Sequence, residues 1–334
     1  MKKIIEQLLG HQSLTQKESR NVMYSIMSGE FNDAQISGFL IALRAKGESS
    51  AEITGFAQAM REKMTPINIQ SDAMDMCGTG GDAKGTFNIS TASSFIVAGA
   101  GVHVAKHGNR SMTSKSGSAD VLTALGVDIT LSPEKVSNCI DEIGIGFMFA
   151  PSLHPAMKYA MGARTALATR TVFNILGPLC NPAGVKRQLV GIFEGSLTDK
   201  IAEVLKKLES KTAMIVHGYD GLDEISTTSS TKISYLKLDK TIKSMAISPS
   251  DFGFSTTTLD SLKGGTPEEN AKIIMNILDG TDKGPKRDIL ILNAAGGILV
   301  GGKVDSFKDG IKYAEESVDS GKALNKLNKL IAIK

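Results

Sequence analysis

Apolar residues recur at helical spacing through the first 64 residues of the chain, between short polar joints. Thr15 and Glu18 form a capping box that opens one helix, and Asn32 or Asp33 caps the next. Ser50 is the expected cap of the last helix in this stretch. The pattern therefore predicts a compact helical unit. Its helices are expected at residues 1–9, 15–29, 32–47 and from 50 onward.

From residue 73 the pattern changes to short apolar runs that alternate with helical stretches and polar loops. This order is typical of a mostly parallel sheet flanked by helices. The expected strands cover residues 73–77, 102–105, 147–150, 188–193, 213–217 and 233–238. One expected helix begins at Ser90 or Thr91 and runs to residue 100, and others cover residues 118–125, 197–208, 267–278 and 307–317. Residues 288–300 suit a strand and a helix equally. The sequence predicts an α/β domain with a small all-α domain at its N-terminus.

The composition is that of an ordinary globular protein, with 41% apolar and 22% charged residues among 334. No apolar run approaches the roughly 18 residues of a membrane helix, and charged residues come too early for a secretory leader. The formal charge of +3 gives no reason to expect a nucleic-acid partner. Cys77, Cys139 and Cys180 are widely spaced, which favours a reducing cytoplasm over a disulfide framework.

Glycine is enriched, at 34 residues, and its densest cluster is CGTGGD at residues 77–82, which we call the glycine loop. Glycines let the backbone approach an anion and turn its N–H groups toward it. GTFNIST follows at residues 85–91 and opens an apolar helix, whose first N–H groups are further donors. The alternative is a tight turn with an ordinary helix cap. Because both halves are present, the sequence favours a phosphate site, although it matches neither a P-loop nor the dinucleotide-binding spacing.

A second polar cluster, KHGNRSMTSKSGSAD at residues 106–120, follows the next expected strand and is called the second loop. Lys106, Arg110 and Lys115 supply positive charge, and the hydroxyl side chains supply donors. A solvated loop without a ligand is the alternative, although loops of this length are uncommon unless they are functional. Two anion-binding loops after consecutive strands predict one ligand that carries more than one phosphate.

Asp223 and Glu224 are adjacent acids in a glycine-containing turn, the acidic turn, after the strand expected to end at His217. Paired carboxylates hold Mg²⁺ where the cation also bridges to substrate phosphates. On spacing alone, a pair of solvated surface acids is the better interpretation, and only the phosphate loops favour a metal site. The histidines and cysteines match no zinc-site spacing, and no nucleophile elbow is present. Taken alone, Arg164 and Arg170 are weak evidence for a ligand site, because a lone arginine is normally a surface residue.

Several long motifs together make the sequence resemble the anthranilate phosphoribosyltransferase family. They are the two loops, HPAMKYAMGARTALATRTVFNILGPLCNPA, GLDEIS, ALRAKGESSAEITGFAQAMR and RDILILNAAGGILVGG, in the family's order and over nearly the whole chain. The resemblance implies a homodimer with a fold related to the pyrimidine nucleoside phosphorylases. It also implies a helical domain at 1–70, an α/β domain at 71–334, a segment around 164–182 that returns to the helical domain, and a helix at 288–300.

The substrates are likewise implied by the resemblance. The donor is 5-phosphoribosyl 1-diphosphate (PRPP), and the acceptor is the amine of anthranilate. The products are N-(5-phosphoribosyl)anthranilate and diphosphate, in tryptophan biosynthesis. Two Mg²⁺ ions per site are expected, with Ser90, Asp223 and Glu224 as their ligands. No nucleic-acid or membrane partner is expected.

The family's binding positions carry over residue by residue. Anthranilate is expected to meet Gly78, His107, Asn109 and Arg164, with Arg164 facing its carboxylate. The donor-binding positions are Gly78, Gly81, Asp82, Thr86, Asn88, Ile89, Ser90, Thr91, Lys106, His107, Gly108, Asn109, Arg110, Ser111, Met112, Thr113, Ser114 and Ser118.

No residue is assigned as a general base, because an aromatic amine is already a neutral nucleophile at pH 7. The site is expected to act by positioning and by electrostatic stabilisation. One alternative is a pyrimidine nucleoside phosphorylase-like enzyme, which would carry a different loop in place of residues 106–110. Another is a non-catalytic nucleic-acid-binding relative, which would need a strongly basic surface. Thr165 departs from the family, in which a second arginine is more often expected after Arg164.

Overall fold

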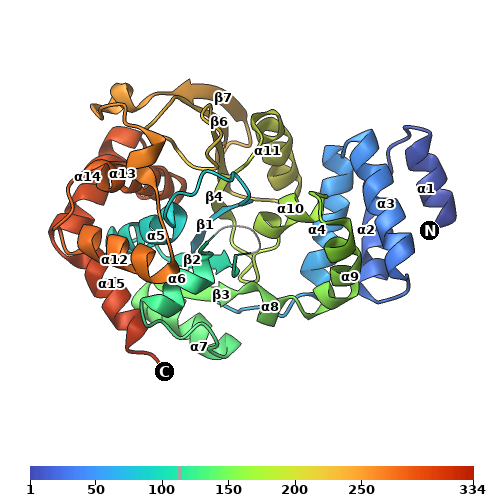
Figure 1. The fold of residues 1–334 in the computed structure, drawn as a ribbon, viewed down its shortest axis with the longest axis horizontal. Coiled ribbons are helices and arrows are strands. Elements are labelled where there is room, and N and C mark those ends of the chain that lie inside the picture. Colours follow the sequence, from blue (N-terminus) through green and yellow to red (C-terminus); the bar gives the residue numbers. More distant parts are fainter. Residues whose placement is uncertain (112–114) are drawn as a thin grey trace.

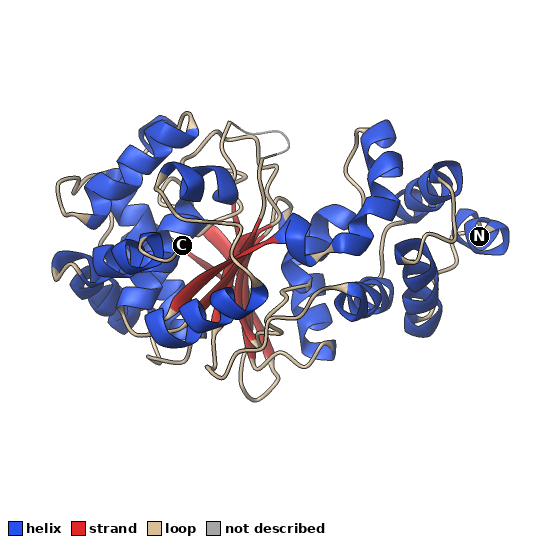
Figure 2. Cartoon of the chain, turned by 90° about the horizontal axis from the view of Figure 1, so that it is seen from below, coloured by secondary structure: helices blue, strands red, loops and turns tan. Residues whose placement is uncertain are grey.

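A twisted seven-stranded sheet separates two layers in the larger part of the molecule (Figures 1 and 2). The computed structural model describes residues 1–111 and 115–334. The strand order is β3-β2-β1-β4-β5-β6-β7, in which the first five are parallel and β6 and β7 are antiparallel to their neighbours. The prediction of a mostly parallel sheet beside a small all-α domain is confirmed. The strands are β1 Met74–Gly78, β2 Val104–Gly108, β3 Ile145–Phe149, β4 Arg187–Gly191, β5 Thr212–Gly218, β6 Thr231–Leu236 and β7 Ile242–Ile247.

Helices cover both faces of this sheet. Successive strand residues point into different layers, as the pleat requires: Leu189 of β4 packs with α5 and α13, whereas Val190 packs with α11. The central strands are therefore buried on both faces, as parallel strands usually are. The helices that follow β1 are α5 Ile89–Gly99, α6 Ser118–Ala124, α7 Pro133–Asn138, α8 Ala150–Leu153, α9 Lys158–Leu167, α10 Phe173–Leu176, α11 Thr198–Lys207, α12 Pro267–Leu278, α13 Pro285–Val300, α14 Phe307–Asp319 and α15 Lys322–Ile331.

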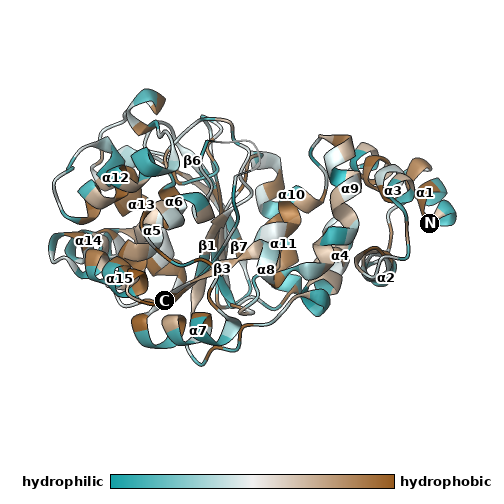
Figure 3. Cartoon of the chain, turned by 60° about the horizontal axis from the view of Figure 1, so that its bottom comes forward, coloured by the Kyte–Doolittle hydropathy of each residue, from teal (hydrophilic) through white to brown (hydrophobic). Residues whose placement is uncertain are grey.

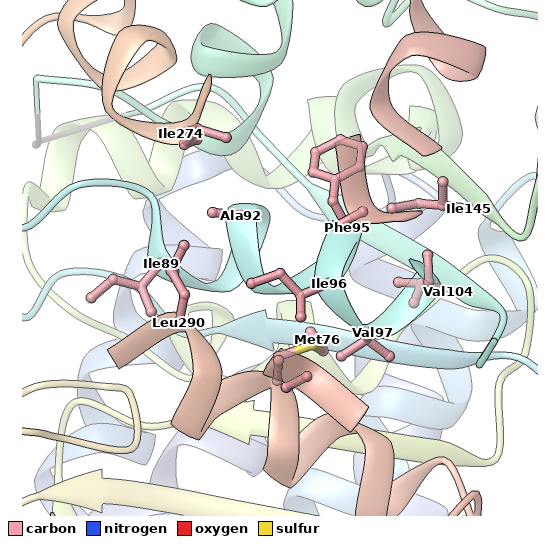
Figure 4. Packing of buried hydrophobic residues seen from close by; sticks show 14 of the residues in the cluster. Met76, Ile89, Ala92, Phe95, Ile96, Val97, Val104, Ile145, Ile274 and Leu290 are labelled. Atoms are coloured by element: carbon pink, nitrogen blue, oxygen red, sulfur yellow. The ribbon is translucent and has the colours of Figure 1, made fainter. Parts of the chain in front are cut away.

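Helices α5 and α13 form the centre of one layer (Figure 4). Ile89 and Phe95 of α5 pack in the same cluster as Leu290 of α13 and Met76 of β1. Every residue of α13 from Ile289 onward is buried. A helix that is apolar all round has no polar stripe to reveal its period, which explains why residues 288–300 were ambiguous. The helix implied by the resemblance is the correct assignment.

The N-terminal helices form a small domain beside the sheet, at the right of Figure 1. The expected capping box of Thr15 and Glu18 is present, and Asn32 caps the third helix. The fourth is capped by Ser49, so the assignment of Ser50 is wrong. The reason is Glu52, which stands three residues after Ser49 and completes a capping box with it. The helices are α1 Lys2–Leu9, α2 Gln16–Met27, α3 Asp33–Lys46 and α4 Ser50–Lys63.

Helices α9 and α10 lie against these N-terminal helices rather than on the sheet, and they belong to the same buried cluster. Arg44 of α3 donates to the carbonyl of Arg170 at 2.6 Å, and Arg61 of α4 donates to that of Leu179 at 2.7 Å. Gly162 of α9 is so close to α3 that a Cβ there would lie 2.2 Å from the Asp33 carboxylate. Two distant parts of the chain thus share one core.

Some elements differ from the prediction. β2 begins later than expected and runs to Gly108, and α7, β7 and α15 were not predicted. β7 is an edge strand with little burial, so it has no apolar run. α15 does carry a helical stripe of Ala323, Leu327 and Leu330, and Figure 3 shows hydrophilic and hydrophobic residues side by side on it. No helix in the described part of the chain is long and apolar enough to cross a membrane.

Candidate functional site

The carboxyl ends of the parallel strands form the edge at which the predicted loops meet. Along the chain β1, β2 and β3 follow one direction across the sheet, and β4 then returns to the other side of β1. Open α/β sheets bind ligands at such a reversal of strand order. Gly78, Gly108 and Gly191 are the last residues of β1, β2 and β4, so these three strand ends carry no side chain.

The glycine loop is folded directly against the acidic turn. The Thr79 N–H donates to the Gly191 carbonyl at 2.9 Å, and the Gly80 N–H donates to Asp223 Oδ2 at 2.8 Å. Gly80 and Gly81 have φ of 65° and 76°, a conformation that glycine adopts without strain. Gly191 is also required, because a Cβ there would lie 1.6 Å from the Asp223 carbonyl oxygen. The predicted phosphate loop and the predicted metal ligands therefore form one site.

Glu224 is buried and Asp223 is half-buried, so the interpretation of the two acids as solvated surface groups is wrong. Glu224 is only 9% exposed, and its Oε1 accepts from the Ser90 N–H at 3.1 Å. Burial, followed by repulsion from Asp82, raises the pKa of Asp223 to about 7. Burial, followed by repulsion from Asp223, raises the pKa of Glu224 well above its usual value. Ionised carboxylates this close together in a dry site need a cationic partner.

Lys106 brings one positive charge to the acidic turn from inside the protein. It is 3% exposed, and its Nζ donates to the Met76 carbonyl at 2.6 Å and to Ser90 Oγ at 3.4 Å. The expectation that Lys106 begins the second loop is wrong, because β2 extends through it to Gly108. Burial lowers the pKa of Lys106. Its ammonium group therefore reaches the first turn of α5 through Ser90.

The N-terminus of α5 reaches this cluster, but its cap differs from the prediction. Asn88 occupies the cap position, whereas Ser90 and Thr91 lie inside the helix. The side chains of Ile89 and Thr91 are buried, at 2% and 1% exposure, so these two residues offer a ligand only their backbone. At this helix end the Ile89 N–H donates to the Phe87 carbonyl at 2.8 Å and the Ser90 N–H donates to Glu224. What the helix end offers an anion is therefore mainly the positive end of its dipole.

The guanidinium of Arg170 reaches the glycine loop. It donates to the Gly81 carbonyl and lies 4.1 Å from the centroid of the Phe193 ring. Its backbone carbonyl accepts from Arg44, as described above. The sequence offered no sign of this contact, because residues 81 and 170 are far apart in the chain.

An acid that the sequence analysis did not single out organises the second loop. Asp120 accepts from the Ser111 N–H at 3.0 Å and from Arg110 Nη1 at 2.9 Å. Ser118 Oγ accepts from the Asn109 N–H and donates to the Asn109 carbonyl, each at 3.1 Å. These bonds hold the base of the loop next to the end of β2. Three predicted donor-binding residues lie outside the described part of the chain: Met112, Thr113 and Ser114.

The residues expected to meet the acceptor lie at the ends of β1 and β2 and on α9. His107 is buried, with its Nε2 3.2 Å from Nε2 of His154, so one ring donates to the other. His154 was missed, although its place after an expected strand at the same sheet edge could have indicated it. Arg164 is half-buried, 5.3 Å from the centroid of the Phe173 ring, and burial lowers its pKa. Among the described residues no carboxylate pairs with Arg164, so its guanidinium is available to a ligand.

The histidine pair predicts a loss of stability in acid. Burial is the main cause, and repulsion from His154 the second, that lowers the pKa of His107 to about 3. Burial lowers the pKa of His154 to about 4. Both values lie below the 6.5 of a free histidine, so only the unfolded chain binds these protons between pH 6.5 and pH 4. Their stabilising contribution is complete above pH 6.5 and falls as the pH decreases.

Because of each histidine, we expect the free energy of unfolding to be about 2 kcal/mol lower at pH 4.5 than at pH 7. Urea unfolding at these two pH values tests this, with His154→Gln as the comparison, since glutamine does not titrate. The free energy of unfolding should differ less between the two pH values in the variant than in the wild type. Equal differences in variant and wild type would show that His154 does not titrate as described.

The acidic turn fits Mg²⁺ by the chemistry of its donors. Asp223 and Glu224 offer hard carboxylate oxygens, and Ser90 offers a hydroxyl beside them. Their raised pKa values mean that the ionised carboxylates are unfavourable without a cation. Within residues 1–111 and 115–334, no three His, Cys, Asp or Glu side chains form a complete metal site.

Comparison with known proteins agrees with this geometry. The model described as glycosyl transferase family, helical bundle domain, matches residues 2–64, and the a/b domain of the same family matches residues 70–324. A protein from Methanocorpusculum labreanum, named anthranilate phosphoribosyltransferase, is 54% identical over 331 residues, which span 98% of this chain and 96% of that protein. This chain belongs to the anthranilate phosphoribosyltransferases.

Solved anthranilate phosphoribosyltransferases have the same fold. The crystal structure of the Thermus thermophilus enzyme aligns with a TM-score of 0.93 at 39% identity and covers 98% of each chain. The Saccharomyces cerevisiae enzyme, solved in complex with PRPP and Mg, aligns with a TM-score of 0.90 at 29% identity, over 98% of this chain and 96% of that one. The family assignment therefore extends over both the helical and the α/β parts.

Proposed function

We propose that the protein transfers the 5-phosphoribosyl group of PRPP to the amine of anthranilate and releases diphosphate, a step of tryptophan biosynthesis. One observation carries the proposal: the glycine loop, the N-terminus of α5 and the buried acidic turn meet where the strand order reverses. Such a site suits an anion that carries several phosphates and arrives with a divalent cation. Membership of the anthranilate phosphoribosyltransferases supports PRPP as that anion.

Donor binding rests mainly on backbone N–H groups in this proposal. Those of the glycine loop after Gly80, together with the positive end of α5, receive the diphosphate, and the second loop, with Asn109 and Arg110, receives the remaining phosphate. We propose two Mg²⁺ ions, one held by Asp223 and Glu224 and one by Ser90. When bound, Mg²⁺ offsets the negative charge of the departing diphosphate.

The transfer itself requires no base from the protein. The lone pair of the anthranilate nitrogen forms the bond to C1 of the ribose, while the C1–O bond to diphosphate breaks and its electron pair leaves with the diphosphate. The nitrogen then releases a proton to water. Lys106 and the N–H groups of α5 stabilise the charge that develops on the leaving group.

In this proposal acceptor positioning falls to Arg164, together with His107 and Asn109. Because both buried histidines are neutral at pH 7, they offer a carboxylate no charge. Arg164 carries the charge instead, and the bond from a guanidinium to a carboxylate is among the stronger hydrogen bonds. Holding the amine in line with C1 supplies the positional part of the rate enhancement.

We also propose a helical domain at 1–70 and an α/β domain at 71–334, with 164–182 as the returning segment. The packing of α9 and α10 on the N-terminal helices supports this division.

A homodimer is proposed through the helical domain, where Leu9 and Ile41 are 58% and 42% exposed. Cys77, Cys139 and Cys180 are free thiols, which supports a cytoplasmic location. Sedimentation equilibrium tests the dimer, and a monomer at micromolar concentration would contradict it.

Product analysis by mass spectrometry distinguishes the proposed reaction from its alternatives. With PRPP, anthranilate and Mg²⁺, we expect anthranilate to gain one phosphoribosyl group and one diphosphate to be released per product. A phosphorylase would instead split a pyrimidine nucleoside with inorganic phosphate. Cleavage of the nucleoside without any phosphoribosylated anthranilate would overturn the proposal.

A further inference from the structure

The side-chain amide of Asn88 ties together the two loops of the donor site. Its Nδ2 donates to the Ser116 carbonyl of the second loop at 3.1 Å, and its Oδ1 accepts from Ser116 Oγ at 3.2 Å. Asn88 also stands at the start of α5, next to the glycine loop. The orientation of this one amide therefore sets how the second loop meets the N-terminus of α5.

Asn270, on α12, determines that orientation. It is 1% exposed, and its Nδ2 donates to Asn88 Oδ1 at 2.9 Å, while its own Oδ1 accepts from the Gly265 N–H at 2.8 Å. A backbone N–H can only donate, so the oxygen of Asn270 must face Gly265 and its NH₂ must face Asn88. Asn88 must then present its oxygen to Asn270, which leaves its NH₂ for Ser116.

The segment before α12 is firmly attached to the donor side of the site, so Asn270 has a fixed position. Gly264 N–H donates to the Gly85 carbonyl at 2.9 Å, and Phe87 N–H donates to the Leu262 carbonyl at 3.2 Å. Gly264 approaches so closely that a Cβ would lie 2.6 Å from the Cα of Phe87. The segments that precede Asn88 and Asn270 are therefore held together.

We propose that Asn270 is a positioning residue for PRPP, acting through Asn88 to hold the two anion-binding loops in the geometry that receives the donor's phosphates. This inference rests on the proposed function. Asn270 does not need to touch the donor, because a buried amide with all its partners fixed transmits its orientation to the next amide. Acceptor binding, at His107 and Arg164, does not depend on it.

Two substitutions separate the contact with Asn88 from other effects. Asn270→Asp keeps an acceptor for Gly265 but places a second acceptor against Asn88 Oδ1, which turns the Asn88 amide over. Asn270→Ala removes both bonds without adding charge. For each we expect the dissociation constant of PRPP with Mg²⁺, measured by calorimetry, to rise about tenfold. The KM for anthranilate should change less than about twofold, since one lost bond on the donor side leaves the acceptor side intact.

Thr266→Ala is the matched control, because it removes the cap of the same helix but leaves the Asn270–Asn88 bond. It should lower the melting temperature without changing PRPP affinity. Asn88→Ala supplies the second control: if Asn270 acts through Asn88, adding Asn270→Ala to that variant should weaken PRPP binding no further.

The outcomes separate this inference from the proposed function. Wild-type protein that binds no PRPP would overturn the proposed function and this inference with it. Normal PRPP binding by Asn270→Ala, an equal loss in Thr266→Ala, or additive losses with Asn88→Ala would overturn the inference alone. Weaker PRPP binding confined to the Asn270 and Asn88 variants, and not additive between them, would support it.

Discussion

Replacing Asp223 by Asn and Glu224 by Gln in one variant should lower kcat by about a hundredfold to a thousandfold. The amides keep the size of the two side chains but no longer balance the charge of a divalent cation. The remaining activity should require more Mg²⁺ for half-saturation. The measurement is kcat as a function of Mg²⁺ concentration at saturating PRPP and anthranilate.

The melting temperature of this variant separates chemistry from folding. Because burial raises the pKa of both acids, neutral amides should leave the metal-free fold at least as stable. Asp239→Asn is a suitable control, since Asp239 is an exposed acid that accepts from Thr241 within its own turn. Unchanged kcat at every Mg²⁺ concentration would contradict the metal role of the acidic turn.

Replacing Arg164 by Ala should raise the KM for anthranilate by about tenfold to a hundredfold, the effect of losing a charge-assisted hydrogen bond. The KM for PRPP should change less than about twofold, because the donor is bound at the other loops. Steady-state kinetics with each substrate varied in turn measures both constants. Arg20→Ala is the matched control, since the Arg20 side chain is 42% exposed and forms an ion pair with Glu62 on its own helical domain.

The pattern of the two constants decides the role of Arg164. A larger rise for anthranilate than for PRPP is the expected result. An equal rise in both would mean that Arg164 maintains the fold around Phe173 and does not contact the acceptor's carboxylate.

Local sequence signals predicted much of the fold. The capping box of Thr15 and Glu18 and the glycine loop are set by residues a few positions apart, and both are present. The ambiguity at residues 288–300 had a physical cause, because α13 is surrounded by apolar neighbours and needs no polar face. β7 was missed for the opposite reason, since an edge strand with exposed residues has no apolar run.

The site was predictable only as separate segments. Nothing in the sequence indicated that the Gly80 N–H donates to Asp223 or that Lys106 Nζ donates to Ser90 Oγ, because these contacts join residues far apart in the chain. The burial of the acidic turn was missed because adjacent acids on a glycine turn are usually solvated. His154 and Asn270 escaped notice because each acts through a single distant side chain.

Anthranilate fluorescence tests the central claim most directly. Purified protein should deplete the fluorescence when PRPP and Mg²⁺ are both present, and depletion should stop when either is omitted or when Mg²⁺ is chelated. That result would establish the transfer and its dependence on the cation. Stable fluorescence with all three components, from folded protein that still binds PRPP, would contradict anthranilate as the acceptor.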